Sequence, residues 1–311
     1  ALDEEDLQEV ENSYLKYENL ITAEVKSIKK NMMAERARLQ KLYLKIHLLP
    51  VSFAFVDKQD QDKIKSSPVK SAPSGNLSSN VLIAKIKEDP NLCAAAKKGE
   101  VDWEAESDVV VQWYKDVLRV DEFMIRFQEL KEPTQEQQLE CVQHLYKKVI
   151  FKSEIIGAYF DQNDLRWNEN KPIIRSMVLK TLKHLDFENP LELQPLSHNE
   201  DEDFEYFETL FSETMSREYE LETIISKKAK NWDASRMAMT DLVILKMALA
   251  EMITFPSIPI KVTINEYIEI SKNYSTPRSK QFVNGILDVL ANELSSEGII
   301  KKSGRGLIDN K

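Results

Sequence analysis

Length, composition and charge narrow the classes of function open to this chain. Its 311 residues, 42% of them apolar, allow one large domain or two smaller domains with buried cores. Only 7 glycines and a charged fraction of 30% favour an all-α protein over a sheet protein. The net charge of −10 argues against a general nucleic-acid coat, because non-specific binding depends on neutralising phosphates. We therefore expect any RNA site on this chain to be local.

The sequence has none of the motifs that indicate an enzyme, a metal site or a membrane protein. It holds no Walker loop, no Gly-x-Ser-x-Gly elbow and no Gly-x-Gly-x-x-Gly fingerprint. Its histidines are scattered, and Cys93 and Cys141 have no second ligand at metal-binding spacing, so we expect reduced thiols and no metal or other cofactor. Neither a run of 18 apolar residues nor a secretion leader occurs. We accordingly expect a cytoplasmic, non-enzymatic protein without membrane contact.

Residues 1–130 show helical patterns but no recognisable motif. An acidic run occupies residues 1–12, and an amphipathic helical pattern follows it. Serine and proline dominate residues 66–80, a composition that predicts a loop without firm packing. We expect a divergent helical N-terminal region over residues 1–130 and a second helical domain over residues 131–311.

Residues 231–288 carry the clearest helical pattern. From Ala238 to Met252 apolar residues recur at intervals of three or four residues, which predicts one buried helix face. Pro256 and Pro259 then end that helix, because proline cannot continue the hydrogen-bond ladder.

Two further helix starts follow in the same segment. Thr263 and Glu266 have the spacing of a capping box, in which each side chain satisfies a backbone donor at a helix start. Thr276-Pro277 predicts another start, since proline is tolerated at the first helical position. Together the three helices predict a compact antiparallel unit.

Three parts of this segment resemble, in order and spacing, the C-terminal signature of the NusB family of bacterial transcription antitermination factors. They are an aliphatic helix closing in Ala248-Leu249-Ala250-Glu251-Met252, a proline opening Ile260-Lys261-Val262-Thr263-Ile264-Asn265-Glu266, and the block Phe282-Val283-Asn284-Gly285-Ile286-Leu287-Asp288. The resemblance covers residues 205–295, extends more loosely over residues 135–185, and hardly reaches residues 1–130. It implies an all-α, NusB-like helical bundle with an extended helical N-terminal region, in a long, Bacteroidetes-like form of the family.

The last predicted helix start combines basic and aromatic residues. Lys272, Arg278 and Lys280 lie near a helix N-terminus, whose positive end ordinarily favours acids. A bound phosphate would resolve that conflict, because backbone donors and basic side chains would both point at it. Tyr274 and Phe282 add aromatic faces on which an unstacked RNA base could lie. The alternatives are a core position for Phe282 and simple solvation of the two basic residues, Arg278 and Lys280.

The resemblance gives this RNA site a specific ligand. In NusB-like proteins this loop and helix start help to bind the boxA element of the leader RNA, so boxA-like single-stranded RNA is the expected ligand. Some members carry an aspartate where this chain has Arg278, so that contact does not carry over.

The resemblance also implies protein partners. NusB pairs with NusE, a small-subunit ribosomal protein, and the pair helps RNA polymerase to read through terminators in the antitermination complex. Asp241 falls where the family has an acidic residue implicated in the NusE contact. On the 3.6-residue repeat it falls at the edge of the buried stripe, so we expect an accessible rim charge that can reach a basic partner. Its alternative role is that of a first-turn acid near a helix start.

The N-terminal end departs from the family, which usually begins with an arginine-rich arm that contacts RNA. Here the chain opens with Ala1-Leu2-Asp3-Glu4-Glu5, and the nearest basic set lies within a predicted helix. We therefore expect either that the arm precedes this sequence or that this lineage lacks it. The missing arm and the net acidity favour a second interpretation, a protein-interaction module without RNA binding.

A third interpretation is a fragment related to ribosomal RNA cytosine methyltransferases, some of which carry a NusB-like N-terminal domain. In those enzymes a Rossmann-like catalytic domain follows, whereas this chain ends shortly after Asp288.

Overall fold

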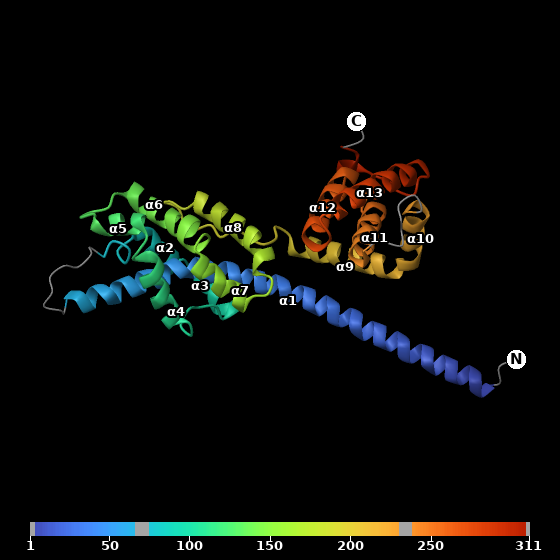
Figure 1. The fold of residues 1–311 in the computed structure, drawn as a ribbon, viewed down its shortest axis with the longest axis horizontal. Coiled ribbons are helices and arrows are strands. Elements are labelled where there is room, and N and C mark those ends of the chain that lie inside the picture. Colours follow the sequence, from blue (N-terminus) through green and yellow to red (C-terminus); the bar gives the residue numbers. More distant parts are fainter. Residues whose placement is uncertain (1–3, 66–74, 230–237, 309–311) are drawn as a thin grey trace. The chain divides into compact units, whose positions relative to one another are not determined.

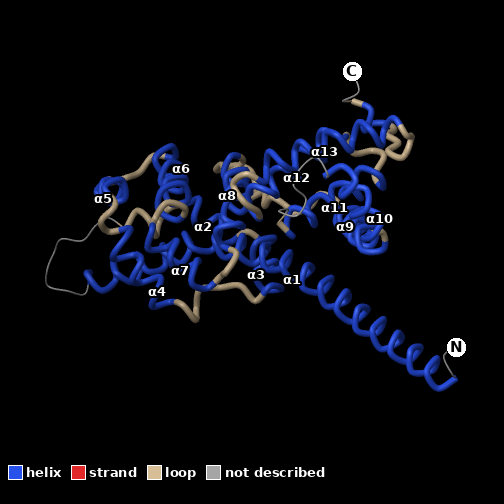
Figure 2. The backbone as a smooth tube through the Cα atoms, turned by 45° about the vertical axis from the view of Figure 1, so that its right-hand side comes forward, coloured by secondary structure: helices blue, strands red, loops and turns tan. Residues whose placement is uncertain are grey.

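We describe the protein from a computed structural model, which describes residues 4–65, 75–229 and 238–308 (Figure 1). Within these ranges every regular element is helical, which confirms the all-α prediction (Figure 2). None of the described helices has the length and apolar character needed to cross a membrane. Side chains of α1 are described for Leu20 and from residue 22 to residue 64.

The chain forms two compact units, Ala1–Leu196 (unit 1) and Ser197–Lys311 (unit 2). This division after Leu196 does not coincide with the boundary expected after residue 130. The reason is packing, because helices between residues 135 and 183 lie against the long first helix and the second helix.

Unit 1 is built around one long helix. Its elements in chain order are α1 (Glu4–Lys65), α2 (Val81–Glu88), α3 (Pro90–Gly99), α4 (Ser107–Trp113), the π-helix η1 (Tyr114–Leu118), α5 (Glu122–Glu129), α6 (Gln135–His144), the π-helix η2 (Leu145–Ile150), α7 (Glu154–Asn163) and α8 (Trp167–Lys183).

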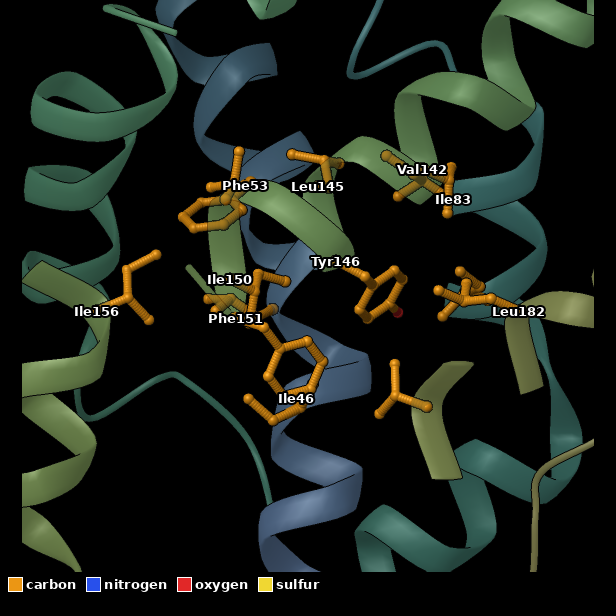
Figure 3. Close-up of a cluster of buried hydrophobic side chains, with 14 of the residues drawn as sticks. Ile46, Phe53, Ile83, Val142, Leu145, Tyr146, Ile150, Phe151, Ile156 and Leu182 are labelled. Carbon is orange, nitrogen blue, oxygen red and sulfur yellow. The ribbon is translucent and has the colours of Figure 1, made fainter. Parts of the chain in front are cut away.

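The C-terminal half of α1 forms the spine of the unit 1 core. Tyr43, Ile46, Leu49 and Phe53 are fully buried and recur at three or four residues, which places them on one helix face. Helices α2, α3, α4 and α8 pack against α1, and η2 brings Tyr146, Ile150 and neighbouring residues into the same cluster (Figure 3). The predicted amphipathic pattern of the N-terminal region is therefore confirmed as a real core face.

Two π-helices bring tyrosines onto buried polar residues of α1. In η1 the hydroxyl of Tyr114 donates to Asp57 Oδ1 at 2.6 Å, and in η2 the hydroxyl of Tyr146 lies 3.1 Å from His47 Nδ1. Both tyrosines begin the sequence Tyr-Lys-x-Val. Each segment is followed by a helix whose N-cap side chain accepts a backbone N–H, so the two segments repeat one local design.

The serine- and proline-rich segment over residues 66–80, predicted as a loop without firm packing, is packed in its second part. Residues 66–74 lie outside the described part of the chain, but residues 75–80 are firmly packed. Leu77 is fully buried, and the amide of Asn76 donates to the backbone oxygens of Phe127 and Leu130. Asn80 caps α2. Composition missed this packing because its partners lie about 50 residues away in the sequence.

Unit 2 is a smaller helical unit around one central helix. Its elements are α9 (Glu200–Ser216), α10 (Glu218–Ala229), α11 (Met239–Thr254), α12 (Ile260–Tyr274), α13 (Ser279–Ser296) and the short 3-10 helix η4 (Gly304–Leu307). Helix α11 packs against α9, α10, α12 and α13. Its predicted apolar face is confirmed, since Leu245, Leu249 and Met252 are fully buried.

A buried carboxylate on α11 ties three helices of unit 2 together. Glu251 accepts hydrogen bonds from Thr263 Oγ1 at 2.7 Å, from the hydroxyl of Tyr267 at 3.2 Å and from the hydroxyl of Tyr206 on α9. Burial, reinforced by this carboxylate, raises the pKa of both tyrosines well above their usual value, so both remain protonated donors.

The contacts of Glu251 correct one prediction. Thr263 does not form a capping box with Glu266: α12 begins three residues earlier, and Thr263 is buried with its hydroxyl on Glu251.

Candidate functional site: the turn between α12 and α13

The candidate RNA site is the turn that joins α12 to α13. Helix α12 ends at Tyr274, and α13 begins at Ser279. Between them, the backbone N–H of Ser275 still bonds to Ser271 O, and the N–H of Ser279 bonds to Thr276 O at 2.9 Å. The turn is therefore a short, hydrogen-bonded connection.

A buried aspartate from α11 holds this turn in place. Ser275 Oγ donates to Asp241 Oδ1 at 2.6 Å, and Ser279 Oγ donates to Asp241 Oδ2 at 2.8 Å. The two serine oxygens also lie 3.0 Å apart, and Thr276 Oγ1 lies 2.8 Å from Ser279 Oγ. Both carboxylate oxygens of Asp241 are thus engaged by the residues at the two ends of the turn.

The expectation that Asp241 is an accessible rim charge is wrong. Only 5% of the residue is exposed. The helical repeat placed it correctly at the edge of the α11 stripe, but α12 and α13 pack against α11, and Ser275 of the turn and Ser279 of α13 supply two hydroxyl donors. The alternative role of a first-turn acid is closer to the structure, since Asp241 does lie in the first turn of α11.

The basic residues expected at the site lie in different environments. Arg278 and Lys280 are exposed at the start of α13. Lys272 is also exposed, but its ammonium pairs with the carboxylate of Glu269 on the same helix. The turn therefore presents two basic side chains, and the third is partly neutralised.

The two aromatic residues expected at the site also differ. Tyr274, at the end of α12, is 53% exposed, so much of its ring is open to solvent. Phe282 is half-buried and packs against the unit 2 core cluster. The core alternative for Phe282 is therefore correct for part of its ring.

The start of α13 carries two exposed cations, Arg278 and Lys280. Its N-cap position is Arg278, whose side chain makes no capping hydrogen bond, and its first turn contains no acid. The backbone N–H groups of Ser279 and Gln281 already bond to Thr276 O and Arg278 O, and the Asp241 carboxylate accepts a hydrogen bond from Ser279 Oγ. An anion at this helix start would therefore be held mainly by the two cationic side chains, with the partial positive charge of the helix end beside them.

Sequence reasoning missed the residues that order this turn. Ser275, Thr276 and Ser279 form its hydroxyl network, and the signal was available in the run Ser275-Thr276-Pro277-Arg278-Ser279, since short hydroxyl side chains around a proline are typical of ordered turns. Asp241, the acceptor that Ser275 and Ser279 share, could not be found that way because it lies 34 residues before Ser275. In the described residues, no group of three or more His, Cys, Asp or Glu side chains is placed to hold a metal ion.

Comparison with known proteins finds similarity in the part of the chain that contains this turn. Residues 172–292 match the model of the NusB family. The matched range begins in α8 and ends in α13. The matched range includes Asp241 and the whole α12–α13 turn.

Curated relatives carry the name "Transcription antitermination protein NusB". The protein from Chloroherpeton thalassium is 51% identical over 90 residues, which is 29% of this chain and 43% of that protein. The protein from Salinibacter ruber is 45% identical over 104 residues, 33% of this chain and 65% of that protein. The protein from Natranaerobius thermophilus is 39% identical over 92 residues, 30% of this chain and 66% of that protein.

These matches leave part of each protein uncovered. The chain spans between 43% and 66% of the length of these curated relatives. A solved structure of T. maritima NusB is 27% identical and covers 42% of this chain and 82% of its own, with a TM-score of 0.29, too low to compare geometry.

Proposed function

We propose that this chain, whose residues 172–292 match the model of the NusB family, is a NusB-family protein with an additional N-terminal region and acts as a non-enzymatic transcription antitermination factor. We propose further that it binds boxA-like single-stranded RNA at the α12–α13 turn and acts together with NusE in the antitermination complex. The names of the curated relatives support the general function.

The observation that carries the RNA proposal is the exposed basic start of α13. Arg278 and Lys280 are exposed at the first turn of α13, where the Arg278 side chain makes no capping hydrogen bond, and Tyr274 nearby is 53% exposed. Phosphate contacts from the two cations and stacking of one base on the tyrosine are the usual means of holding single-stranded RNA. Base stacking is tolerant of sequence, so this site alone would give modest specificity.

The role of Asp241 in this proposal is positional. Its carboxylate is engaged by Ser275 and Ser279, so it fixes the two ends of the turn that presents Arg278. We propose that it influences RNA and NusE binding through the shape of this turn, and that its side chain makes no direct contact with either partner.

Salt dependence of RNA binding tests the proposal. Fluorescence anisotropy with a labelled boxA-type single-stranded RNA should show weak binding by the chain alone. Two or three phosphate contacts predict a slope of log affinity against log salt of about −1.4 to −2, at roughly −0.7 per contact for single strands. A slope steeper than about −5 would mean a larger site elsewhere on the chain.

An interaction module without RNA binding is the second candidate function. The net charge of −10 favours it. RNA binding that stays undetectable even with NusE present would support this candidate and reject the RNA proposal.

A further inference from the structure

The apolar stripe of α1 continues beyond the core of unit 1. Leu39 is the first residue of the stripe that packs against the core cluster. Ile28 and Met32 fall within about 40° of Leu39 on the helical wheel, at 100° per residue. They are nevertheless 44% and 46% exposed, and both views show the N-terminal half of α1 extending past the other helices of its unit (Figures 1 and 2).

The same spacing runs through the preceding sequence. Apolar residues recur at three or four positions back from Met32, a pattern typical of a coiled-coil seam. In sequence order the set is Leu7, Val10, Tyr14, Tyr17, Ile21, Val25, Ile28 and Met32. All eight lie within α1. Ile28 and Met32 expose apolar surface of this stripe to water, and exposed apolar surface favours association.

The charges along this half of α1 are strongly asymmetric. Residues 3–11 contain six acids and no basic residue, whereas residues 26–41 contain six basic residues and one acid. Within the basic stretch Lys26 and Lys30 are exposed, while Arg38 is held by Asp164 of its own unit. One helix therefore carries both a negative and a positive end along one apolar stripe.

We propose that two copies of this chain pair through the N-terminal halves of α1, lying antiparallel. The eight apolar positions are nearly symmetric about residue 19.5, so position 7 of one copy meets position 32 of the other, and position 14 meets position 25. In this register residues 4–11 of each copy lie opposite residues 28–35 of the other.

Charge complementarity selects this arrangement over the alternatives. A parallel pair would place six acids against six acids, and flanking charges decide the orientation of paired helices. Each copy carries both the acidic and the basic stretch. In an antiparallel pair each stretch therefore lies near the opposite charge on the other copy, and the two copies are related by a twofold axis.

Sedimentation velocity on the full chain tests the pairing. At about 100 μM chain a dimer should form, and it should dissociate on dilution and at high salt. Ile28→Asp with Met32→Asp should give a monomer with an unchanged helical circular dichroism spectrum, since both residues are exposed. Phe55→Asp is the matched control, because Phe55 is 62% exposed on α1 but lies outside the stripe, and it should leave the dimer intact.

Charge reversal tests the orientation. Lys30→Glu should weaken the dimer at least about tenfold, because Lys30 of each copy faces Glu9 of the other and both pairs are lost, whereas Lys58→Glu, at another exposed lysine of α1, should not. Mixing Lys30→Glu chains with Glu9→Lys chains should restore a heterodimer.

Cysteine pairing gives a direct measure of the register. In a Cys93→Ser background, chains with Tyr14→Cys mixed with chains with Val25→Cys should form a disulfide between the two variants. A wild-type chain that is monomeric at about 100 μM overturns the proposal. A dimer in which Tyr14→Cys chains cross-link only to one another would be parallel, and would overturn it too.

Discussion

The contact between Asp241 and the α12–α13 turn makes a quantitative prediction about stability. Asp241→Ala removes the hydrogen bonds from Ser275 and Ser279. Hydrogen bonds to a charged group contribute about 1.5–3 kcal/mol each, so the gross loss is about 3–6 kcal/mol. Part of this loss is offset, because burying the carboxylate also has a desolvation cost and the two serines can still bond to each other. We expect a net loss of about 2–3 kcal/mol.

Urea unfolding followed by circular dichroism measures this loss. Asp241→Asn should cost less, about 1 kcal/mol, since the amide keeps one acceptor oxygen and its NH2 group can donate to a serine that rotates. The matched control is Asp288→Ala on α13, an exposed aspartate whose change should stay within about 0.5 kcal/mol of wild type.

Stability of Asp241→Ala within about 0.5 kcal/mol of wild type would refute the reasoning, since it would mean that the turn does not depend on this carboxylate. RNA affinity of Asp241→Asn should also fall, because the ends of the turn loosen. Normal affinity in that variant would remove Asp241 as a positioning residue.

Two predictions concern the buried polar residues of unit 1. Burial lowers the pKa of His47 to about 3, below its unfolded value of about 6.5, so folding excludes the proton and stability falls as pH drops from 6.5 toward 3, by about 1.4 kcal/mol per unit. The free energy of unfolding, measured with urea, should therefore fall between pH 7 and pH 4.5 by about 2.7 kcal/mol more in wild type than in His47→Leu. An equal fall in the two proteins would contradict this. Tyr114→Phe should cost about 1.5–3 kcal/mol because its hydroxyl donates to the Asp57 carboxylate, whereas Tyr146→Phe, whose partner is neutral His47, should cost about 0.5–1.5 kcal/mol. A larger loss of unfolding free energy for Tyr146→Phe than for Tyr114→Phe would contradict this prediction.

Periodicity predicted the parts of the fold that depend on one helix at a time. The apolar face of α11 follows from residues spaced along that helix, and Leu245 and Leu249 are buried as the spacing required. The end of α11 near Pro256 follows from the covalent chemistry of proline, which acts locally.

Periodicity failed where the decisive partner lies on another helix. The helical wheel placed Asp241 at a stripe edge, but only the packing of α12 and α13 determines that this edge is buried. Thr263 has the spacing of a cap with Glu266, yet it bonds to Glu251, twelve residues earlier. Lys272 looked available to RNA, and its pairing with Glu269 depends on a rotamer choice that sequence does not specify.

Basic residues and aromatic residues indicate the candidate site independently, and in the structure they differ in exposure. Arg278 and Lys280 are exposed as a binding site requires, while Phe282 is half-buried and packs against the unit 2 core. The π-helices had no sequence signal of their own. Their role in bringing Tyr114 and Tyr146 onto α1 emerges only from the packed structure.

The central claim, that the start of α13 binds RNA, is tested most directly by reversing its exposed charges. Anisotropy titrations with boxA-type RNA should show that Arg278→Glu with Lys280→Glu binds at least about tenfold more weakly than wild type, with an unchanged melting temperature. The matched control, Lys261→Glu with Lys301→Glu, changes the charge of unit 2 equally at exposed positions and should bind normally. Wild-type affinity in the Arg278 and Lys280 variant, or an equal loss in the control, would contradict the account.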